Sequence, residues 1–281
     1  MKTKAGNVEK SSKLGRILVY IILLIVSFTM LVPFLWMVLT AFMTQTESTQ
    51  VNPFVIIPAN WQLNNFRDVI DSMNFMRLYG VTVALIVGRV IAAVLTATLA
   101  GYAFARLEFF GKKVLFTIVV VQLMIPSQIF IIPQFQMVQS LGQLDTFFAL
   151  MFPGLVTAFG TFLLRQAYLG LPRDLEEAAI LDGCNIGQVF LFVMAPLVKA
   201  SMVALGIFTA IFAYRELLWP LIVNRTLLPL SAALASLQGQ FVTHFPRLMA
   251  AAVLATIPMI IIYLIFQKHF VEGIATAGGK L

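Results

Sequence analysis

Three charged side chains, Arg89, Arg215 and Glu216, lie inside otherwise apolar stretches of the sequence. A guanidinium removed from water recognises carboxylate or phosphate oxygens through paired hydrogen bonds. A lone charge in a membrane segment costs about 2.5–3.5 kcal/mol, so each of these side chains needs a partner. Two interpretations follow: the three residues line a polar path for a solute, or Arg89 and Glu216 form a structural pair.

A second charged segment has the pattern of a short helix. Asp174 and Glu177, three positions apart, are typical of a helix start, where acidic side chains favour the positive end of the helix dipole. Gly183 is typical of a helix end. We expect a helix of about two to three turns within a cytoplasmic loop over 172–196. Since so short a helix is marginal in water, either a partner holds it or it is an ordinary interfacial loop helix.

The sequence contains none of the common motifs for catalysis. The phosphate loop GxxxxGK[ST], the serine-hydrolase motif GxSxG and the zinc motif HExxH are all absent. Cys184 is the single cysteine, which permits no internal disulfide. We expect no catalytic residue, no metal site and no cofactor bound by this chain.

The elements that position these residues follow from the composition. Of 281 residues, 60% are hydrophobic and 11% are charged, whereas soluble domains average about 25% charged. One water-soluble core cannot bury this apolar excess, so the surface must face lipid. Six apolar runs are long enough to cross about 30 Å of hydrocarbon: 17–42, 78–105, 114–132, 146–169, 197–222 and 248–267. They predict an all-α, polytopic membrane helical bundle, with one transmembrane domain over 1–281.

Small residues recur at every fourth position of the second run, at Ala93, Ala97, Gly101 and Ala105. Such spacing places them on one side of a helix. Small side chains allow membrane helices to approach closely. We therefore expect this side of the second helix to pack against a neighbour.

The basic residues predict the orientation. Thirteen of the 19 Lys and Arg residues lie in the two terminal segments or in and beside the second-to-third and fourth-to-fifth connections, with Arg165 and Lys199 counted at the edges of the latter. Cytoplasmic loops carry such an excess, so we expect a multi-pass membrane protein with both termini cytoplasmic. This bias also explains the net charge of +7, and membrane lipid rather than nucleic acid is the expected partner.

One segment resembles a known family. The run Glu177-Ala178-Ala179-Ile180-Leu181-Asp182-Gly183, followed by Phe190 and Pro196-Leu197, resembles the EAA loop of bacterial ABC importer permeases. Nearly the whole chain is similar to carbohydrate-uptake permeases related to the second membrane subunit of the maltose importer. Three weaker segments agree in order: Tyr102-Ala103-Phe104-Ala105-Arg106-Leu107, Phe162-Leu163-Leu164-Arg165-Gln166 and Phe270-Val271-Glu272-Gly273.

This resemblance implies roles for residues in the predicted short helix. The helix would be a coupling helix that docks into a cleft of a separate ATPase subunit. Glu177 would be its polar contact, and Ala178 and Ala179 would allow close approach. Asp182 and Gly183 would complete the motif, with Gly183 making the turn.

The resemblance also implies a location in the bacterial inner membrane, partners and a cargo. It implies a homologous second permease, two ATPase subunits that use ATP and Mg²⁺, and an extracytoplasmic solute-binding protein. ATP-driven closure would expose a midplane site alternately to each side of the membrane, as rigid-body motion. The cargo would be a carbohydrate, and an acidic oligosaccharide if Arg89 and Arg215 line the path.

Three rival functions remain to be separated. An ABC permease for another solute class, such as amino acids, is not excluded by the EAA loop alone. A self-powered secondary carrier would place carboxylates in its spans, yet Glu216 is the only acidic residue in the six runs. A membrane enzyme is disfavoured by the missing motifs. We therefore expect a transport subunit rather than an enzyme.

Overall fold

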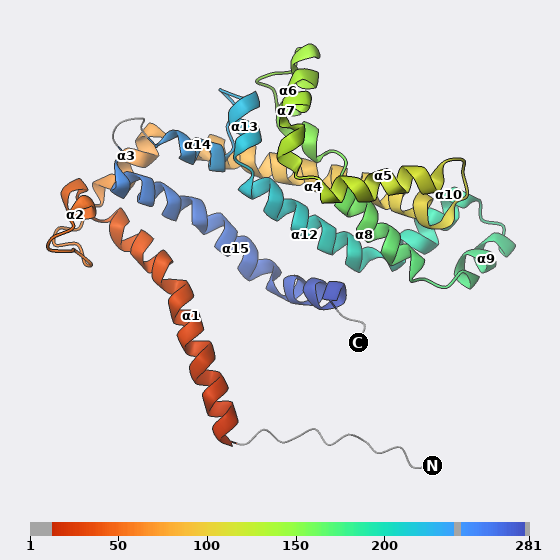
Figure 1. The fold of residues 1–281 in the computed structure, drawn as a ribbon, viewed down its shortest axis with the longest axis horizontal. Helices are drawn as coiled ribbons and strands as arrows, with labels where there is room; N and C mark the ends of the chain where they lie inside the picture. The colour runs from red at the N-terminus through yellow and green to blue at the C-terminus, as the bar shows by residue number, and fades with distance from the viewer. Residues whose placement is uncertain (1–12, 239–242, 279–281) are drawn as a thin grey trace. The chain divides into compact units, whose positions relative to one another are not determined.

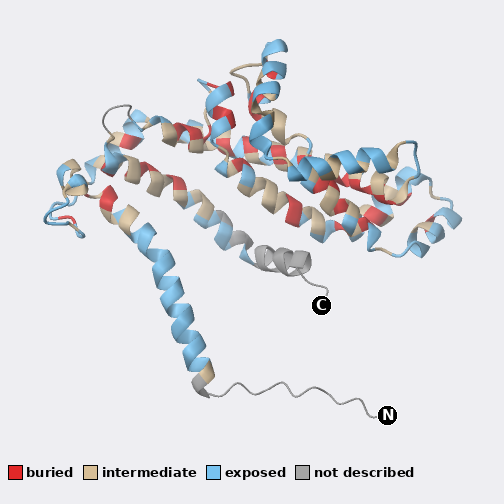
Figure 2. Cartoon of the chain, in the orientation of Figure 1, coloured by how far each residue is buried: buried red, intermediate tan, exposed pale blue. Residues whose placement is uncertain are grey.

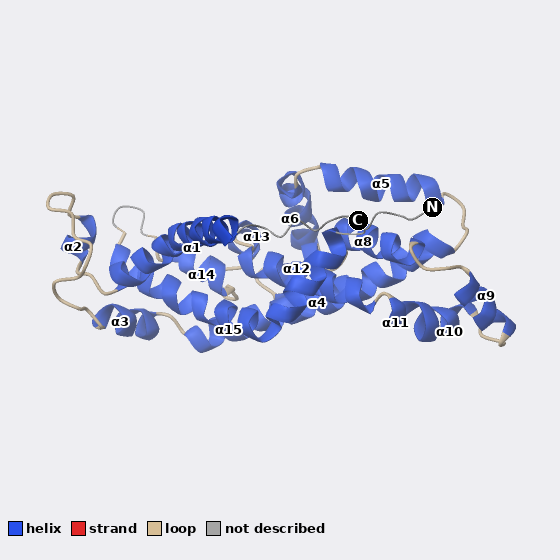
Figure 3. Cartoon of the chain, turned by 90° about the horizontal axis from the view of Figure 1, so that it is seen from below, coloured by secondary structure: helices blue, strands red, loops and turns tan. Residues whose placement is uncertain are grey.

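The computed structural model describes residues 13–238 and 243–278, and every regular element drawn within them is a helix (Figure 1, Figure 3). The predicted all-α class is confirmed. In chain order the elements are α1 Lys13–Ala41, α2 Gln45–Thr49, α3 Asn64–Ser72, α4 Phe75–Arg106, α5 Lys112–Met124, η1 Ser127–Phe130, α6 Ile131–Ser140, α7 Phe147–Met151, η2 Phe152–Gly154, α8 Ala158–Leu169, α9 Asp174–Leu181, α10 Ile186–Gln188, η3 Val189–Met194, α11 Ala195–Leu197, α12 Lys199–Arg215, α13 Leu218–Val223, α14 Leu230–Ser236 and α15 Phe245–Gly278.

Three of the predicted spans lie in unbroken helices, and the other three are interrupted. Gly15–Ala41 and Phe75–Arg106 are long and apolar enough to cross a membrane alone. The sixth predicted run, 248–267, lies within α15, which is one continuous helix from Phe245 to Gly278. The remaining runs are helix pairs with a sharp bend: Lys112–Met124 with Ser127–Ser140 (107°), Phe147–Gly154 with Ala158–Leu169 (45°), and Ile186–Leu197 with Lys199–Arg215 (72°).

The expectation that 114–132 forms one helix is wrong. α5 ends at Met124 because Pro126 lacks an amide hydrogen, and its ring disfavours helical backbone at the residue before it. Ile125 is accordingly extended, with φ −92° and ψ 127°. The predicted helix over 197–222 is likewise divided, because α12 ends at Arg215 and the next residue is extended.

Packing divides the chain into two compact units, Met1–Met73 with Gln238–Thr256, and Asn74–Leu237 with Ile257–Leu281. In the first unit, α1 buries none of its most apolar stretch within the chain (Figure 2). The end of α1 is fixed to the following segment, because the Asn65 amide donates to the carbonyls of Ala41 and Met43, each at 2.9 Å. A free apolar helix of this kind is suited to a lipid surface.

The core of the second unit is formed where α4 packs against α8 and α12. The four small residues of α4 are all buried there. A Cβ at Gly101 would lie 2.8 Å from the Leu164 Cβ, so only glycine permits this approach of α4 to α8. Tyr102 stacks edge-on with Tyr168, with ring centroids 5.5 Å apart. The predicted packing side of the second helix is thus confirmed.

Candidate functional site

A cavity of about 700 Å³ lies in the second unit, beside the ends of α5, η2 and α12. Its volume is in the range of small-molecule sites, about 300–1,000 Å³. Arg89, Arg215 and Glu216 all line it, so the structure brings together the three charged residues singled out in the sequence. Six uncharged polar residues complete the polar part of the lining: Gln122, Ser127, Gln128, Gln134, Thr157 and Thr209.

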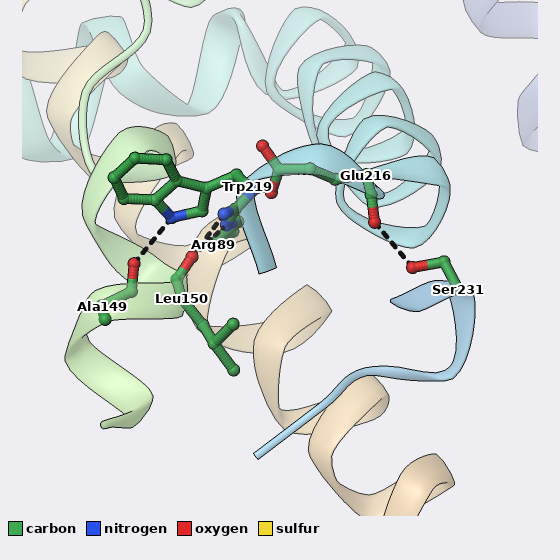
Figure 4. Close-up of polar contacts among 6 residues, drawn as sticks. All are labelled: Arg89, Ala149, Leu150, Glu216, Trp219 and Ser231. Carbon is green, nitrogen blue, oxygen red and sulfur yellow. Dashed lines mark hydrogen bonds and ion pairs between the residues drawn. The ribbon is translucent and has the colours of Figure 1, made fainter. Parts of the chain in front are cut away.

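Arg89 and Glu216 form an ion pair at one wall of this cavity (Figure 4). The Arg89 Nη1 lies 2.5 Å from the Glu216 Oε2. The Arg89 Nε donates to the Leu150 carbonyl at 3.2 Å, and Nη2 donates to the same oxygen. Because Arg89 is only 5% exposed, its charge is neutralised within the chain. The structural pairing considered from the sequence is therefore present.

A glycine makes room for this guanidinium. A Cβ at Gly154 would lie 2.6 Å from the Arg89 Cδ and 2.9 Å from its Nε, closer than side-chain packing permits. Gly154 ends η2, directly after the helix that carries Leu150. The short turn at η2 thus lets the Arg89 side chain reach both of its partners.

Arg215 differs from Arg89 in having no carboxylate partner among the residues that the structure describes. It is exposed, it lines the cavity, and the ion pairs of the described residues do not include it. The cavity therefore holds two guanidinium groups and one carboxylate. The lining therefore carries one positive charge in excess.

Packed helices hold the residues of the ion pair in position. The Trp219 Nε1 donates to the Ala149 carbonyl at 2.8 Å, and the Ser231 hydroxyl donates to the Glu216 carbonyl at 2.6 Å (Figure 4). Trp219 is buried in an apolar cluster with Leu85, Val138, Ala149, Leu150 and Val223. These contacts fix the start of α13 and hold the Glu216 backbone in place.

The loops beyond this block are joined through Asp145. Its Oδ1 accepts the backbone N–H groups of Arg225 and Thr226, each at 2.9 Å, and its Oδ2 accepts the Thr226 hydroxyl at 3.0 Å. These bonds, led by the Thr226 N–H, hold the pKa of the Asp145 carboxyl below its ordinary value. The turn before α7 and the loop after α13 are thereby tied together.

The chemistry that the cavity supports is hydrogen bonding. Its lining contains amides, hydroxyls and charged groups, but neither histidine nor cysteine. Elsewhere in the described residues, no three His, Cys, Asp or Glu side chains gather in one place. These groups are suited to holding a hydroxyl-rich solute.

The predicted short helix is α9, and its ends agree with the sequence only in part. It begins at Asp174 and spans eight residues, with three acidic residues in its first turn. The N-cap, however, is Arg173, which makes no side-chain bond, so the two acids do not form a capping box. The helix ends at Leu181, and Gly183 has φ +88°, a conformation that glycine adopts without strain.

The residues of the EAA run divide between two sides of α9. Ala179 is only 8% exposed and joins the core cluster that contains Tyr102 and Tyr168. It therefore faces its own chain, which differs from the expectation that both alanines face a partner. Six residues of α9 are exposed: Asp174, Leu175, Glu177, Ala178, Ile180 and Leu181. Asp182 and Gly183, in the turn that follows, are exposed as well.

Arg106, at the end of α4, connects α9 to the core, a role that the sequence did not indicate. Its Nη2 donates to the carbonyls of Tyr168 and Leu171, each at 2.6 Å. Its Nε lies 3.5 Å from the Glu176 Oε1. Both side chains are largely buried, so movement of α9 bears directly on α4 and on the end of α8.

Comparison with known proteins places these features in context. Residues 93–276 match the family described as binding-protein-dependent transport system inner membrane component. The arabinooligosaccharides transport system permease protein AraQ of Halalkalibacterium halodurans is 30% identical, over 91% of this chain and 93% of its own length. The lactose transport system permease protein LacG of Rhizobium radiobacter is 25% identical, over 93% and 95%.

A solved structure shares the fold. It is that of a bacterial ABC transporter involved in the import of the acidic polysaccharide alginate. The likeness covers 93% of this chain and 98% of that chain, with a TM-score of 0.76 and 22% identity. At this identity the likeness concerns the fold alone.

Proposed function

We propose, from the premise that this chain belongs to the family of binding-protein-dependent transport system inner membrane components, that it is the permease of a bacterial carbohydrate importer. It is a multi-pass protein of the inner membrane and a transport subunit rather than an enzyme. It works with a separate ATPase and a solute-binding protein. Relatives named for arabinooligosaccharide and lactose transport support the carbohydrate class.

The observation that carries the proposal is the cavity with its lining of amides and hydroxyls. Gln122, Gln128 and Gln134 each offer a donor and an acceptor, and sugar hydroxyls need both. The solute would sit where α5, η2 and α12 end, in the manner of transporters whose sites lie at broken helices. A homologous second permease would supply the other half of the path.

Energy would enter through α9. We assign the exposed residues around Glu177 to the contact with the ATPase, while Ala179 anchors the helix to its own chain. Arg106 then joins α9 to α4, and the same helix carries Arg89 at the cavity wall. A rigid connection of this kind passes movement of α9 to the cavity without requiring deformation of the core.

The orientation follows from the basic residues, and a labelling experiment tests it. We expect cytoplasmic termini, so a cysteine replacing the exposed Asp71 on α3 should react with an impermeant thiol reagent in intact cells. Cys184, in the turn after α9, should react only after the cells are permeabilised. Labelling of Cys184 alone in intact cells would reverse the topology.

The charge left on Arg215 points to an acidic saccharide, bearing uronate or phosphate, as cargo. A charge-assisted contact is worth about 1.5–3 kcal/mol, so Arg215→Gln should reduce uptake of such a saccharide about 10- to 100-fold. Basal ATPase activity and assembly should be unchanged, because Arg215 forms no ion pair with another described residue.

The measurement is uptake into vesicles that hold the assembled transporter with ATP inside. Arg225→Gln is the matched control, because it removes the same charge from an exposed position that does not line the cavity. Uptake of neutral sugars only would exclude the acidic cargo but keep the carbohydrate function. Uptake of amino acids, or uptake without the ATPase, would contradict the proposed function itself.

A further inference from the structure

The loop between α2 and α3 is apolar and free of charge. From residue 48 to residue 66 the sequence contains no Asp, Glu, Lys or Arg, although Glu47 and Arg67 bound this stretch. Its large apolar side chains lie outside the core of the first unit. Four residues near its tip are more than half exposed: Val51, Phe54, Ile56 and Ile57. A cluster of this kind in a loop marks a surface that something covers.

The base of this loop is closed by hydrogen bonds. The Glu47 Oε1 accepts the backbone N–H of Ala59 at 3.0 Å, and the Phe42 carbonyl accepts the backbone N–H of Gln62 at 2.8 Å. Glu47 also forms a capping box with Thr44 at the start of α2. Residues 50–57 lie between these ties and form a loop whose base is fixed.

Phe54, in the tip of this loop, packs against α1. Its ring stacks on Trp36, with centroids 5.2 Å apart and planes inclined by 4°. Trp36 precedes the end of α1 at Ala41 by five residues, which at 1.5 Å per residue is about 7–8 Å. The tip therefore lies beside the last turns of the span rather than beyond them.

The length of α1 gives the depth of the loop tip relative to the membrane. The apolar helix Gly15–Ala41 has 27 residues, and at 1.5 Å per residue it is about 40 Å long. A bilayer has about 30 Å of hydrocarbon and about 40–45 Å including the headgroup regions. A point about 7–8 Å from the end of such a helix lies near the boundary of hydrocarbon and headgroups, where Trp is enriched.

We propose that the 50–57 loop is a membrane anchor that lies in the interface at the Ala41 end of α1. Its occupant is lipid: Val51, Ile56 and Ile57 contact acyl chains. The backbone stays at headgroup level, where water satisfies the polar groups that no helix pairs. The lipid-facing surface of α1 is thereby continued by the loop, and the depth of the helix is fixed.

The test uses the assembled transporter in vesicles of phosphatidylcholine and phosphatidylglycerol. Cys184→Ser removes the single native cysteine, and Ile56→Cys or Ile57→Cys carries an environment-sensitive fluorophore without disturbing the Trp36–Phe54 stack. Leu24→Cys in the middle of α1 is the lipid control, and Asp71→Cys on α3 is the water control. Emission is then quenched either by lipids with a nitroxide near the headgroup or by aqueous iodide.

We expect the nitroxide lipid to quench at positions 56 and 57 at least as strongly as at position 24. Iodide should quench these positions several-fold less than it quenches position 71. Iodide quenching equal to that at position 71 would place the loop in water and overturn the proposal. Protection from both quenchers would mean that a protein partner covers the loop, which would equally overturn it. Neither result would bear on carbohydrate uptake.

Discussion

Gly183→Val is expected to uncouple ATP hydrolysis from uptake. Gly183 has φ +88°, and a side chain in this conformation costs about 1–2 kcal/mol. The chain would relieve this cost by changing the turn after α9, which would move Glu177 and the exposed apolar residues away from the ATPase. A free-energy change of about 1–2 kcal/mol changes the ratio of the native turn to the altered turn about 5- to 30-fold. Uptake should fall accordingly and binding of the ATPase should weaken, while membrane insertion should be unchanged.

Gly142→Val is the matched control for this variant. Gly142 has φ +65°, and at both glycines a Cβ would meet no atom within 4 Å, so the two substitutions introduce similar backbone strain without a clash. Gly142 follows α6, far along the chain from α9. Transport assays and co-purification with the ATPase compare the two. Normal uptake by Gly183→Val, or equal loss in both variants, would remove α9 from the coupling mechanism.

Glu216→Gln is expected to destabilise the protein strongly. The substitution removes the carboxylate that neutralises Arg89 and leaves a buried cation, which costs about 3–5 kcal/mol in pairs of this kind. We expect low yield and a lower melting temperature of the purified complex, whatever sugar is present. By comparison, Glu108→Gln breaks the exposed pair with Lys112 and should cost at most about 1 kcal/mol.

A double variant separates structure from transport at this pair. Arg89→Gln with Glu216→Gln removes both charges, and replacing a whole buried pair is often nearly neutral. We expect its melting temperature to recover most of the loss. Recovered stability with normal uptake would make the pair purely structural, whereas recovered stability without uptake would assign it to the path. Failure to recover would contradict the electrostatic explanation.

The sequence predicted the all-α class and the positions of the unbroken helices, because both depend on composition and on the period of the apolar residues. The runs that became α1 and α4 needed no correction. The bend of α5 was harder to predict, because a proline is compatible with a kinked helix as well as with a turn of 107°. Which of the two occurs depends on how the residues after Pro126 pack, and local helix propensity does not predict tertiary packing.

The charged residues of the site could be predicted from the sequence, but the groups that hold them in place could not. Arg89, Arg215 and Glu216 are conspicuous because charge is rare in apolar runs. The Leu150 carbonyl that holds Arg89 belongs to the backbone and has no side-chain signal at all. Arg106 and Glu176 lie far apart in the sequence, and only the packing of α4 against α8 brings them together.

The pairing of Arg89 with Glu216 also has a consequence for synthesis. Roughly 130 residues separate the two, and a ribosome adding about 5–20 residues per second needs about 6–25 s to cover them. Throughout this time α4 carries a cation whose carboxylate does not yet exist. Until α12 is made, the unpaired charge of Arg89 must therefore be stabilised by the insertion machinery or by water, so that α4 stays in the bilayer.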